Sequence, residues 1–222
     1  ISRMAAMICR SVNFSGAVQT HRYSGGSGGG GNPQNFTRGS FLRGAVQSPD
    51  GLLLVVGDFA AIELRILSWL AREPKLINAI IGNADIYSDF ASLFYRRPIS
   101  KADKVERQFG KFAILGLGYG MGADKFAAMV KTTCKIGLSE GAARSTVDLY
   151  RTTYFNVPKL WETASLMIPM IAQGAISCLP FAPFIKVQKC RLILPSGLAI
   201  QYPNLRAVRE GRRLEWMYDI YR

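Results

Sequence analysis

The sequence has few of the residues that build metal centres. It contains one histidine, His21, and four cysteines without metal-binding spacing, at Cys9, Cys134, Cys178 and Cys190. This pattern excludes a cysteine-rich metal site and predicts reduced thiols in a cytosolic protein. No apolar run is as long as a membrane span, and residues 1–9 are too short and too poorly flanked for a signal peptide. We therefore expect no membrane partner.

Acidic residues are also scarce. There are 15 Asp and Glu against 28 Lys and Arg, which gives a formal charge of +13. So basic a chain attracts polyanions, although basicity alone does not choose among DNA, RNA and acidic membranes. Nine tyrosines, twelve phenylalanines and three tryptophans offer stacking surfaces and favour a nucleic acid. With 222 residues, 49% of them hydrophobic, the chain can form one large domain or two small ones.

The first of two stretches that organise the chain runs from Asp58 to Arg65. It follows residues 51–57, an apolar run after the turn signal Ser48-Pro49-Asp50-Gly51 that predicts a buried strand. Helical spacing begins at Ile62, so Asp58 is expected between the strand and a helix. Two roles fit an aspartate there: capping the helix, or binding Mg²⁺, which takes one or two carboxylates together with water and phosphate oxygens.

The second stretch, residues 107–120, predicts an amphipathic helix that begins near Lys101. Its two faces differ in chemistry: one carries Lys104, Arg107, Lys111 and Leu115, and the other carries Phe109, Phe112, Ala113 and Leu117. Cations on one face repel one another, so the pattern fits either a solvated basic face or a phosphate site. Because glycines from Gly116 to Gly122 allow close approach, we favour binding of a nucleoside triphosphate and a base.

Other segments carry ordinary structural signals. Glu73-Pro74 and Asp85 are expected to start helices, and Ser100 with Asp103 approximates a capping box. Helical spacing predicts further helices at roughly 123–132, 139–154 and 157–173, the last with Leu166 in the core. Residues 185–204 predict a β-hairpin, whereas residues 206–222 fit a strand or a loop.

The two organising stretches together resemble motifs A and B of family A DNA polymerases, the DNA polymerase I group. Their residues are most similar to those of bacteriophage members. Motif A reads Asp-Tyr-Ser-Gln-Ile-Glu-Leu-Arg in that family and is matched at Asp58, Ile62, Glu63, Leu64 and Arg65. Motif B reads Arg, three residues, Lys, three residues, an aromatic, three residues and Tyr-Gly, and is matched at Arg107, Lys111, Tyr119 and Gly120. The resemblance extends over residues 13–205.

The resemblance implies an α+β fold shaped like a right hand, with helical fingers inserted between β-segments of the palm. It assigns residues 1–71 to the palm with motif A, residues 72–178 to the fingers with the motif B helix, and residues 179–222 to a return to the palm. The family's motif C, a His-Asp-Glu that supplies a second metal-binding Asp, does not occur in the sequence. The sequence also has no initiator methionine at its start. We therefore expect this chain to be a part of a longer polymerase, and to end before the motif C of that polymerase.

By this resemblance, the function is template-directed transfer of a nucleotide from a dNTP to a primer 3′-hydroxyl. Two Mg²⁺ ions assist that reaction in the family. Asp58 would bridge both ions with help from the backbone carbonyl of Phe59. Arg107 and Lys111 would bind the β- and γ-phosphates.

The resemblance also assigns contacts to the sugar and the bases. Glu63 would exclude a 2′-hydroxyl, and Tyr119 would stand at the template base. Leu115 replaces the aromatic residue that usually stacks on the incoming nucleotide, so contact there lacks a π-face. Tyr87 stands where the family often carries a phosphate-contacting histidine.

Primer–template contacts are expected ahead of motif A. Residues 25–31 alone would be a flexible glycine-rich linker, but their flanks resemble segments that line the duplex near the primer end in the family. The residues implied to contact DNA are Arg22, Gln34, Asn35, Arg38 and Arg43. The expected partners are therefore primer–template DNA and dNTPs, in the cytoplasm of a bacterium or a phage-infected cell.

Two other functions fit parts of the pattern. One is a non-catalytic module that binds primer–template DNA, if this chain is the complete product. The other is a relative of single-subunit RNA polymerases, which share the Arg/Lys helix. Glu63 and the Asn32-Pro33-Gln34-Asn35 segment argue against this second alternative.

Overall fold

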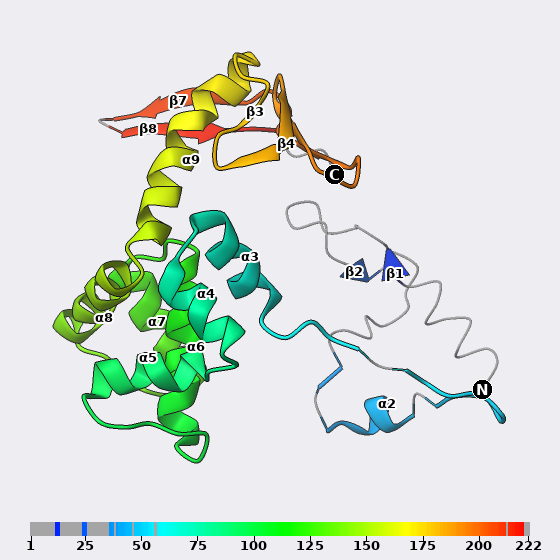
Figure 1. Ribbon diagram of the computed structural model, residues 1–222, viewed down its shortest axis with the longest axis vertical. Helices are drawn as coiled ribbons and strands as arrows, with labels where there is room; N and C mark the ends of the chain where they lie inside the picture. The colour runs from blue at the N-terminus through cyan, green and yellow to red at the C-terminus, as the bar shows by residue number, and fades with distance from the viewer. Residues whose placement is uncertain are drawn as a thin grey trace. The chain divides into compact units, whose positions relative to one another are not determined.

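The computed structural model describes residues 12–13, 24–25, 36–37, 39–45, 47–55, 57–211 and 213–219. The chain divides into two compact units, residues 1–58 with 220–222 and residues 59–219. In the first unit, strand β1 (Val12–Asn13) pairs antiparallel with β2 (Ser24–Gly25), and α2 (Phe41–Gly44) is a single helical turn (Figure 1).

The prediction of a buried strand over residues 51–57 is wrong. The turn before it forms, with the amide of Leu52 donating to the carbonyl of Pro49 at 3.1 Å. Residues 52–55, however, belong to no strand, and Leu53 and Val55 are 91% and 90% exposed. A strand needs a neighbour to satisfy its backbone groups, and none of the described strands pairs with this segment.

The second unit begins with seven described helices. They are α3 (Ile62–Ala71), α4 (Pro74–Ile81), α5 (Ile86–Tyr95), α6 (Lys104–Gly118), α7 (Ala123–Cys134), α8 (Glu140–Thr153) and α9 (Asn156–Gln173). Pro74 opens α4, because its fixed backbone suits a first helical position and its missing amide is not needed there. Every predicted helix is confirmed. Among the residues that the structure describes, no helix is both long and apolar enough to cross a bilayer.

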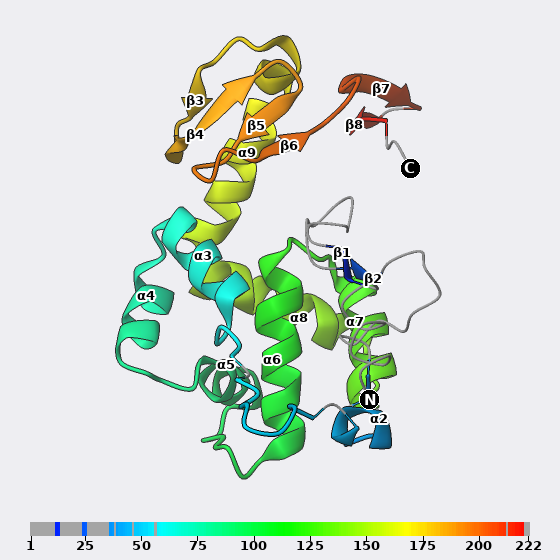
Figure 2. The same cartoon turned by 90° about the vertical axis from the view of Figure 1, so that its right-hand side faces the viewer.

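Helix α6 lies at the centre of this helical group (Figure 2). The face predicted to be apolar is its buried face, because Phe109, Ala113 and Leu117 are each at most 1% exposed. They pack with residues of α5, α7 and α8 such as Phe90, Phe126 and Tyr150 in one hydrophobic core. The opposite face of α6, with its cations, therefore remains available for other contacts.

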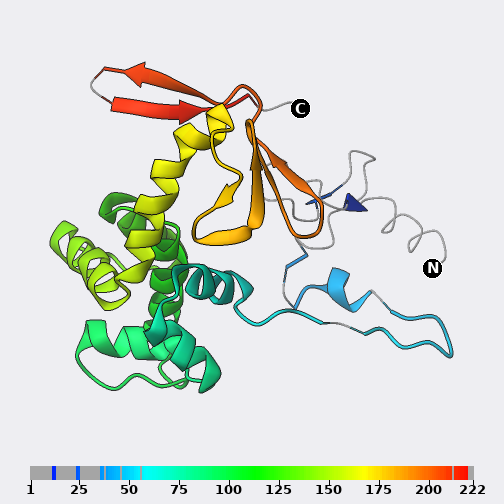
Figure 3. The same cartoon turned by 45° about the horizontal axis from the view of Figure 1, so that its top comes forward.

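A small antiparallel sheet follows the helices. Strands β3 (Cys178–Leu179), β4 (Ala182–Gln188), β5 (Arg191–Ile193) and β6 (Ala199–Gln201) pair in chain order, and β7 (Arg206–Glu210) pairs with β8 (Arg213–Met217) (Figure 3). Ile171 near the end of α9 packs with Leu179, Ala182 and Val187 in a second core. The predicted hairpin and the α+β class are confirmed. Leu166, placed in the core from sequence, is instead 68% exposed.

Candidate functional site

The polar face of α6 carries Arg107 and Lys111, one helical turn apart. Both side chains are half-buried, and so is that of Leu115, which follows on the next turn. Arg107 has partners, described below. Lys111 makes no hydrogen bond or ion pair with any described residue, so its ammonium group is available for an anion.

A cavity of about 260 Å³ opens beside Arg107, between the start of α3, the α4–α5 connection and α6. The cavity lining includes three cations, Arg65, Lys101 and Arg107, and one carboxylate, that of Asp85. The first residues of α5, whose backbone amides carry partial positive charge, form part of the wall. The complete lining consists of Ala60, Ala61, Leu64, Arg65, Ile80, Asn83, Ala84, Asp85, Ile86, Tyr87, Lys101 and Arg107. This excess of positive charge suits an anion such as a phosphate group.

Arg107 is held in this cavity by a two-pronged ion pair with Asp85. Its Nε donates to Asp85 Oδ2 at 2.7 Å and its Nη2 donates to Oδ1 at 3.2 Å. The guanidinium carbon also lies 5.6 Å from the ring centre of Tyr87. Burial alone would raise the pKa of Asp85, but hydrogen bonds from Arg107 and Ser88 and the charge of Arg107 lower it below its ordinary value. The same hydrogen bond raises the pKa of Arg107, so both partners are charged at neutral pH.

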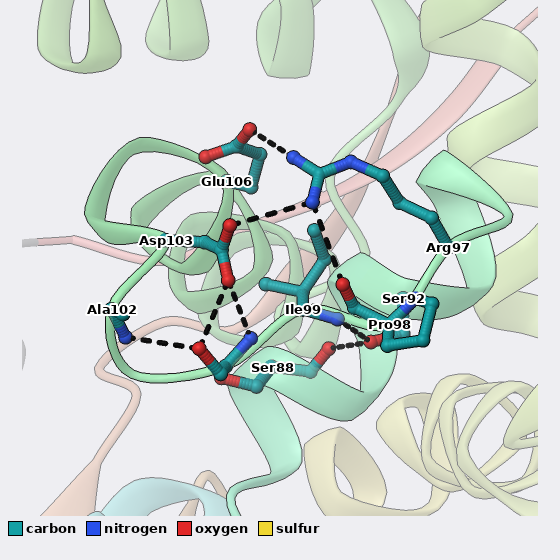
Figure 4. Close-up of polar contacts among 9 residues, drawn as sticks. Ser88, Ser92, Arg97, Pro98, Ile99, Ala102, Asp103 and Glu106 are labelled. Atoms are coloured by element: carbon teal, nitrogen blue, oxygen red, sulfur yellow. Dashed lines mark hydrogen bonds and ion pairs between the residues drawn. The ribbon is translucent and has the colours of Figure 1, made fainter.

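The loop between α5 and α6, which carries Lys101, is fixed by a network of polar contacts (Figure 4). Arg97 forms ion pairs with Asp103 and Glu106. Asp103 accepts hydrogen bonds from the amide and hydroxyl of Ser100 at 2.9 and 3.0 Å. The predicted capping box is nevertheless wrong, because α6 begins at Lys104 and its N-cap is Asp103 rather than Ser100. The amide of Ile99 donates to the Ser92 hydroxyl at 2.8 Å and ties the loop to α5.

Close packing at Gly110 brings the start of α5 against α6. A Cβ atom at Gly110 would lie 2.1 Å from the carbonyl oxygen of Tyr87 and 3.1 Å from the Cβ of Ala91. Only glycine fits at this contact, which sets Asp85 and Tyr87 beside Arg107. Sequence reasoning missed this role of Gly110, although a glycine inside a helical pattern is a recognised sign of close approach.

Asp85 was expected only as a helix cap. It does occupy the N-cap position of α5, but its side chain makes no capping hydrogen bond and binds Arg107 instead. Tyr87, one residue inside the helix, is half-buried, and burial raises the pKa of its hydroxyl. Both residues line the cavity, so both belong to the candidate site.

Tyr119, at the C-terminal end of α6, lines a larger cavity of about 620 Å³. Its side chain is 72% exposed. Most of the cavity wall is apolar or aromatic, with Trp161 on α9 and Trp216 on β8. The lining residues are Tyr119, Gly120, Trp161, Ala164, Ser165, Met167, Ile168, Ile171, Leu179, Phe181, Leu192, Tyr202, Leu205, Trp216 and Tyr218. Such a wall offers flat surfaces beside the end of α6.

The motif A residues fall at the junction of the two units. Asp58 is the last residue of the first unit before Phe59 opens the second, and both are exposed. Arg65 donates from Nε to the carbonyl of Ala60 at 2.8 Å, and Glu63 is half-buried on α3. No group of three or more His, Cys, Asp or Glu side chains able to hold a metal ion occurs among the described residues. The described side chains alone therefore do not fit a two-ion centre.

The predicted DNA contacts lie mostly outside the described residues, as is the case for Arg22, Gln34, Asn35 and Arg38. Arg43 is the exception. It is exposed on α2 and donates from Nε to the carbonyl of Phe36 at 3.0 Å.

Comparisons with known proteins point to one family. The model of DNA polymerase family A matches residues 32–167. The chain is 36% identical over 126 residues to DNA polymerase I of Synechocystis sp., and 30% identical over 177 residues to the DNA polymerase of Bacillus phage SP02. These alignments cover 56% and 75% of this chain, but only 12% and 26% of the two relatives. Residues 32–167 contain both motif A and motif B, and on this match the chain belongs to DNA polymerase family A.

Proposed function

We propose that this chain contributes the nucleotide-binding part of a DNA polymerase that transfers nucleotides from dNTPs to a primer 3′-hydroxyl on a template. One observation carries the proposal: on the polar face of α6, Lys111 has no partner among the described residues, and Arg107 lies beside a cation-lined cavity. Family membership supplies the reaction class, since the matched relatives are named DNA polymerases.

In this proposal, Arg107 and Lys111 bind the triphosphate. The two cations bind phosphate in different ways. The rigid guanidinium fork of Arg107 sets the orientation of the phosphate that it binds, whereas the ammonium group of Lys111, on its flexible stem, can follow the phosphate oxygens. Arg65 and Lys101 line the same cavity as Arg107 and add positive potential around the phosphates. That potential also offsets the charge that grows on the leaving pyrophosphate as the bond to the α-phosphate breaks.

Three further residues are proposed to shape the nucleotide pocket. Glu63 on α3 would exclude a ribose 2′-hydroxyl, and Tyr119 would stand at the template base beside the aromatic cavity. Leu115 would contact the incoming base through its aliphatic side chain alone. Helix α3 packs against α6, which brings the segments carrying these residues together.

Asp58 and the carbonyl of Phe59 are proposed as part of the ligand set for the two Mg²⁺ ions of the complete enzyme. Mg²⁺ when bound would neutralise phosphate charge. The remaining ligands would have to come from outside the described residues. Asp58 is exposed and makes no described hydrogen bond, so it is free to bind an ion.

The remaining assignments rest on family membership. We propose that residues 1–71 and 179–222 belong to a palm and residues 72–178 to fingers. Primer–template DNA would be held by residues ahead of motif A, namely Arg22, Gln34, Asn35, Arg38 and Arg43. We further propose that this work takes place in the cytoplasm of a bacterium or an infected cell, a proposal supported by the bacterial and phage origin of the relatives.

The test compares Lys111→Ala with Lys131→Ala. Lys131 is exposed on α7 and lines neither cavity described above, so its loss removes the same charge elsewhere. Binding of dATP with Mg²⁺ should weaken roughly 10- to 100-fold in Lys111→Ala, which loses a charge-assisted contact to phosphate. Lys131→Ala should bind dATP as the original chain does, and both variants should bind primer–template DNA equally. Equal dATP affinity in the two variants would refute the proposed role.

A further inference from the structure

We propose that Asp85 is a positioning residue that presets the orientation of Arg107 for a triphosphate. The inference rests on the proposed function, because it assumes that Arg107 binds phosphate. It concerns a residue outside both polymerase motifs, 22 positions before Arg107 in the chain.

The first support is the way in which the pair is anchored. Asp85 Oδ2 accepts hydrogen bonds from Arg107 Nε at 2.7 Å and from the hydroxyl of Ser88 at 2.9 Å. Ser88 is only 3% exposed, so it offers the carboxylate a fixed donor. The carboxylate is therefore held from the α5 side, and it in turn fixes two nitrogens of the guanidinium.

The second support is what the pair leaves open. Arg107 has five N–H donors, and Asp85 engages only Nε and Nη2. No described residue accepts a hydrogen bond from Nη1. The side chain of Arg107 is 32% exposed, compared with 18% for Asp85. A phosphate can thus approach Nη1 without displacing Asp85, which makes the carboxylate a holder of Arg107 rather than a competitor of the ligand.

The third support is the ring of Tyr87, which lies against the guanidinium at 5.6 Å. A flat ring beside one surface of the group and a carboxylate along one edge together restrict rotation of the arginine side chain. Freezing a long side chain on binding costs a factor of about two to ten in affinity, and a side chain already held avoids this loss.

The test measures dATP affinity with Mg²⁺ in Asp85→Asn and Asp89→Asn. Asp89 is exposed on the same helix and makes no described hydrogen bond or ion pair, so the two variants lose equal charge. Positioning predicts about three- to tenfold weaker binding in Asp85→Asn, and no loss in Asp89→Asn. Counter-ion competition predicts the opposite sign, with tighter binding in Asp85→Asn. Equal or tighter binding in Asp85→Asn than in Asp89→Asn would overturn the inference.

A second pair of measurements separates this inference from the proposed function. If Asp85 acts through Arg107, then adding Asp85→Asn to Arg107→Ala should not weaken dATP binding further. If Arg107→Ala alone leaves affinity unchanged, the proposed function fails, and the inference fails with it. If Arg107→Ala weakens binding while Asp85→Asn does not, only the inference fails.

Ser88→Ala provides a variant that leaves the ion pair in place, should Asp85→Asn not fold. It removes the hydroxyl that anchors Asp85 and should weaken dATP binding about twofold, again only when Arg107 is present. A Ser88→Ala chain with unchanged affinity would contradict the proposed anchoring. Melting curves of all variants distinguish a loss of folding from a loss of affinity.

Discussion

Replacing Gly110 by alanine should force α5 away from α6. The added Cβ would lie 2.1 Å from the carbonyl oxygen of Tyr87, and this oxygen belongs to the backbone of α5 and cannot rotate aside. Restoring an ordinary contact of about 3.4 Å or more requires the helices to separate by at least about 1.3 Å. The start of α5 carries Asp85, so the same movement would disturb the ion pair with Arg107.

Two opposing effects set the magnitude. Overpacking of a tight contact costs up to about 3 kcal/mol. Alanine in a helix interior is favoured over glycine by about 1 kcal/mol. We expect a net loss of about 2 kcal/mol, which lowers the melting temperature of a chain of this size by about 4–8 °C.

Thermal unfolding followed by circular dichroism measures this loss. Gly141→Ala is the matched control, because Gly141 lies in α8, is exposed, and has no heavy atom within 4 Å of an added Cβ. The control should leave stability unchanged or raise it by up to about 1 kcal/mol. A Gly110→Ala chain that melts at or above the temperature of the original would refute the close packing on which the site geometry depends.

Three further predictions concern the same unit. Glu73→Ala should lower the free energy of unfolding in urea by about 2–4 kcal/mol. The fully buried Glu73 carboxylate accepts hydrogen bonds from the amides of Lys75 and Asn156 and so joins α4 to α9. Glu162 is exposed, so Glu162→Ala, the control, should cost under about 0.5 kcal/mol. Because the pKa of Asp85 is lowered on folding, its stabilising effect is complete above the ordinary value of about 3.9 and is lost as the pH falls through the lowered value. Acid titration of stability should therefore show a component below about pH 4 that Asp85→Asn lacks, and an identical acid limb in both chains would contradict the ion pair. Phe184→Ala should cost at least about 1 kcal/mol and change tryptophan emission, since its ring stacks on Trp69 with centres 5.0 Å apart; unchanged emission would exclude that stacking.

Local patterns were sufficient to predict the helices of the second unit. Their signals lie within a few residues, as with the alternation of Arg107 and Lys111 with Phe109 and Ala113 along α6. The cap pattern at Glu73-Pro74 likewise marked the start of α4 within one residue. Such features need no knowledge of distant neighbours, and the structure confirms them.

Features that depend on distant neighbours could not be predicted. Apolar composition alone predicted a strand at residues 51–57, yet a strand also needs a partner, and composition does not supply one. Asp85 fits a helix cap from its local context, whereas its ion pair with Arg107 depends on how α5 packs against α6. That packing depends in turn on Gly110, whose importance appears only once Tyr87 is placed opposite it.

The two cations of α6 are prepared in different ways, and this difference bears on how a triphosphate would bind. Arg107 is held by Asp85 and Tyr87, so it presents a fixed direction before any ligand arrives. Lys111 has no described partner, and its ammonium group on a flexible stem can follow the phosphates as they settle. A cation that is already held orients the ligand and loses little conformational entropy on binding, while a free cation attracts the ligand over a range of ligand positions. Loss of Asp85 should therefore weaken triphosphate binding because Arg107 is no longer held in one orientation, whereas loss of Lys111 should weaken it because a positive charge is removed.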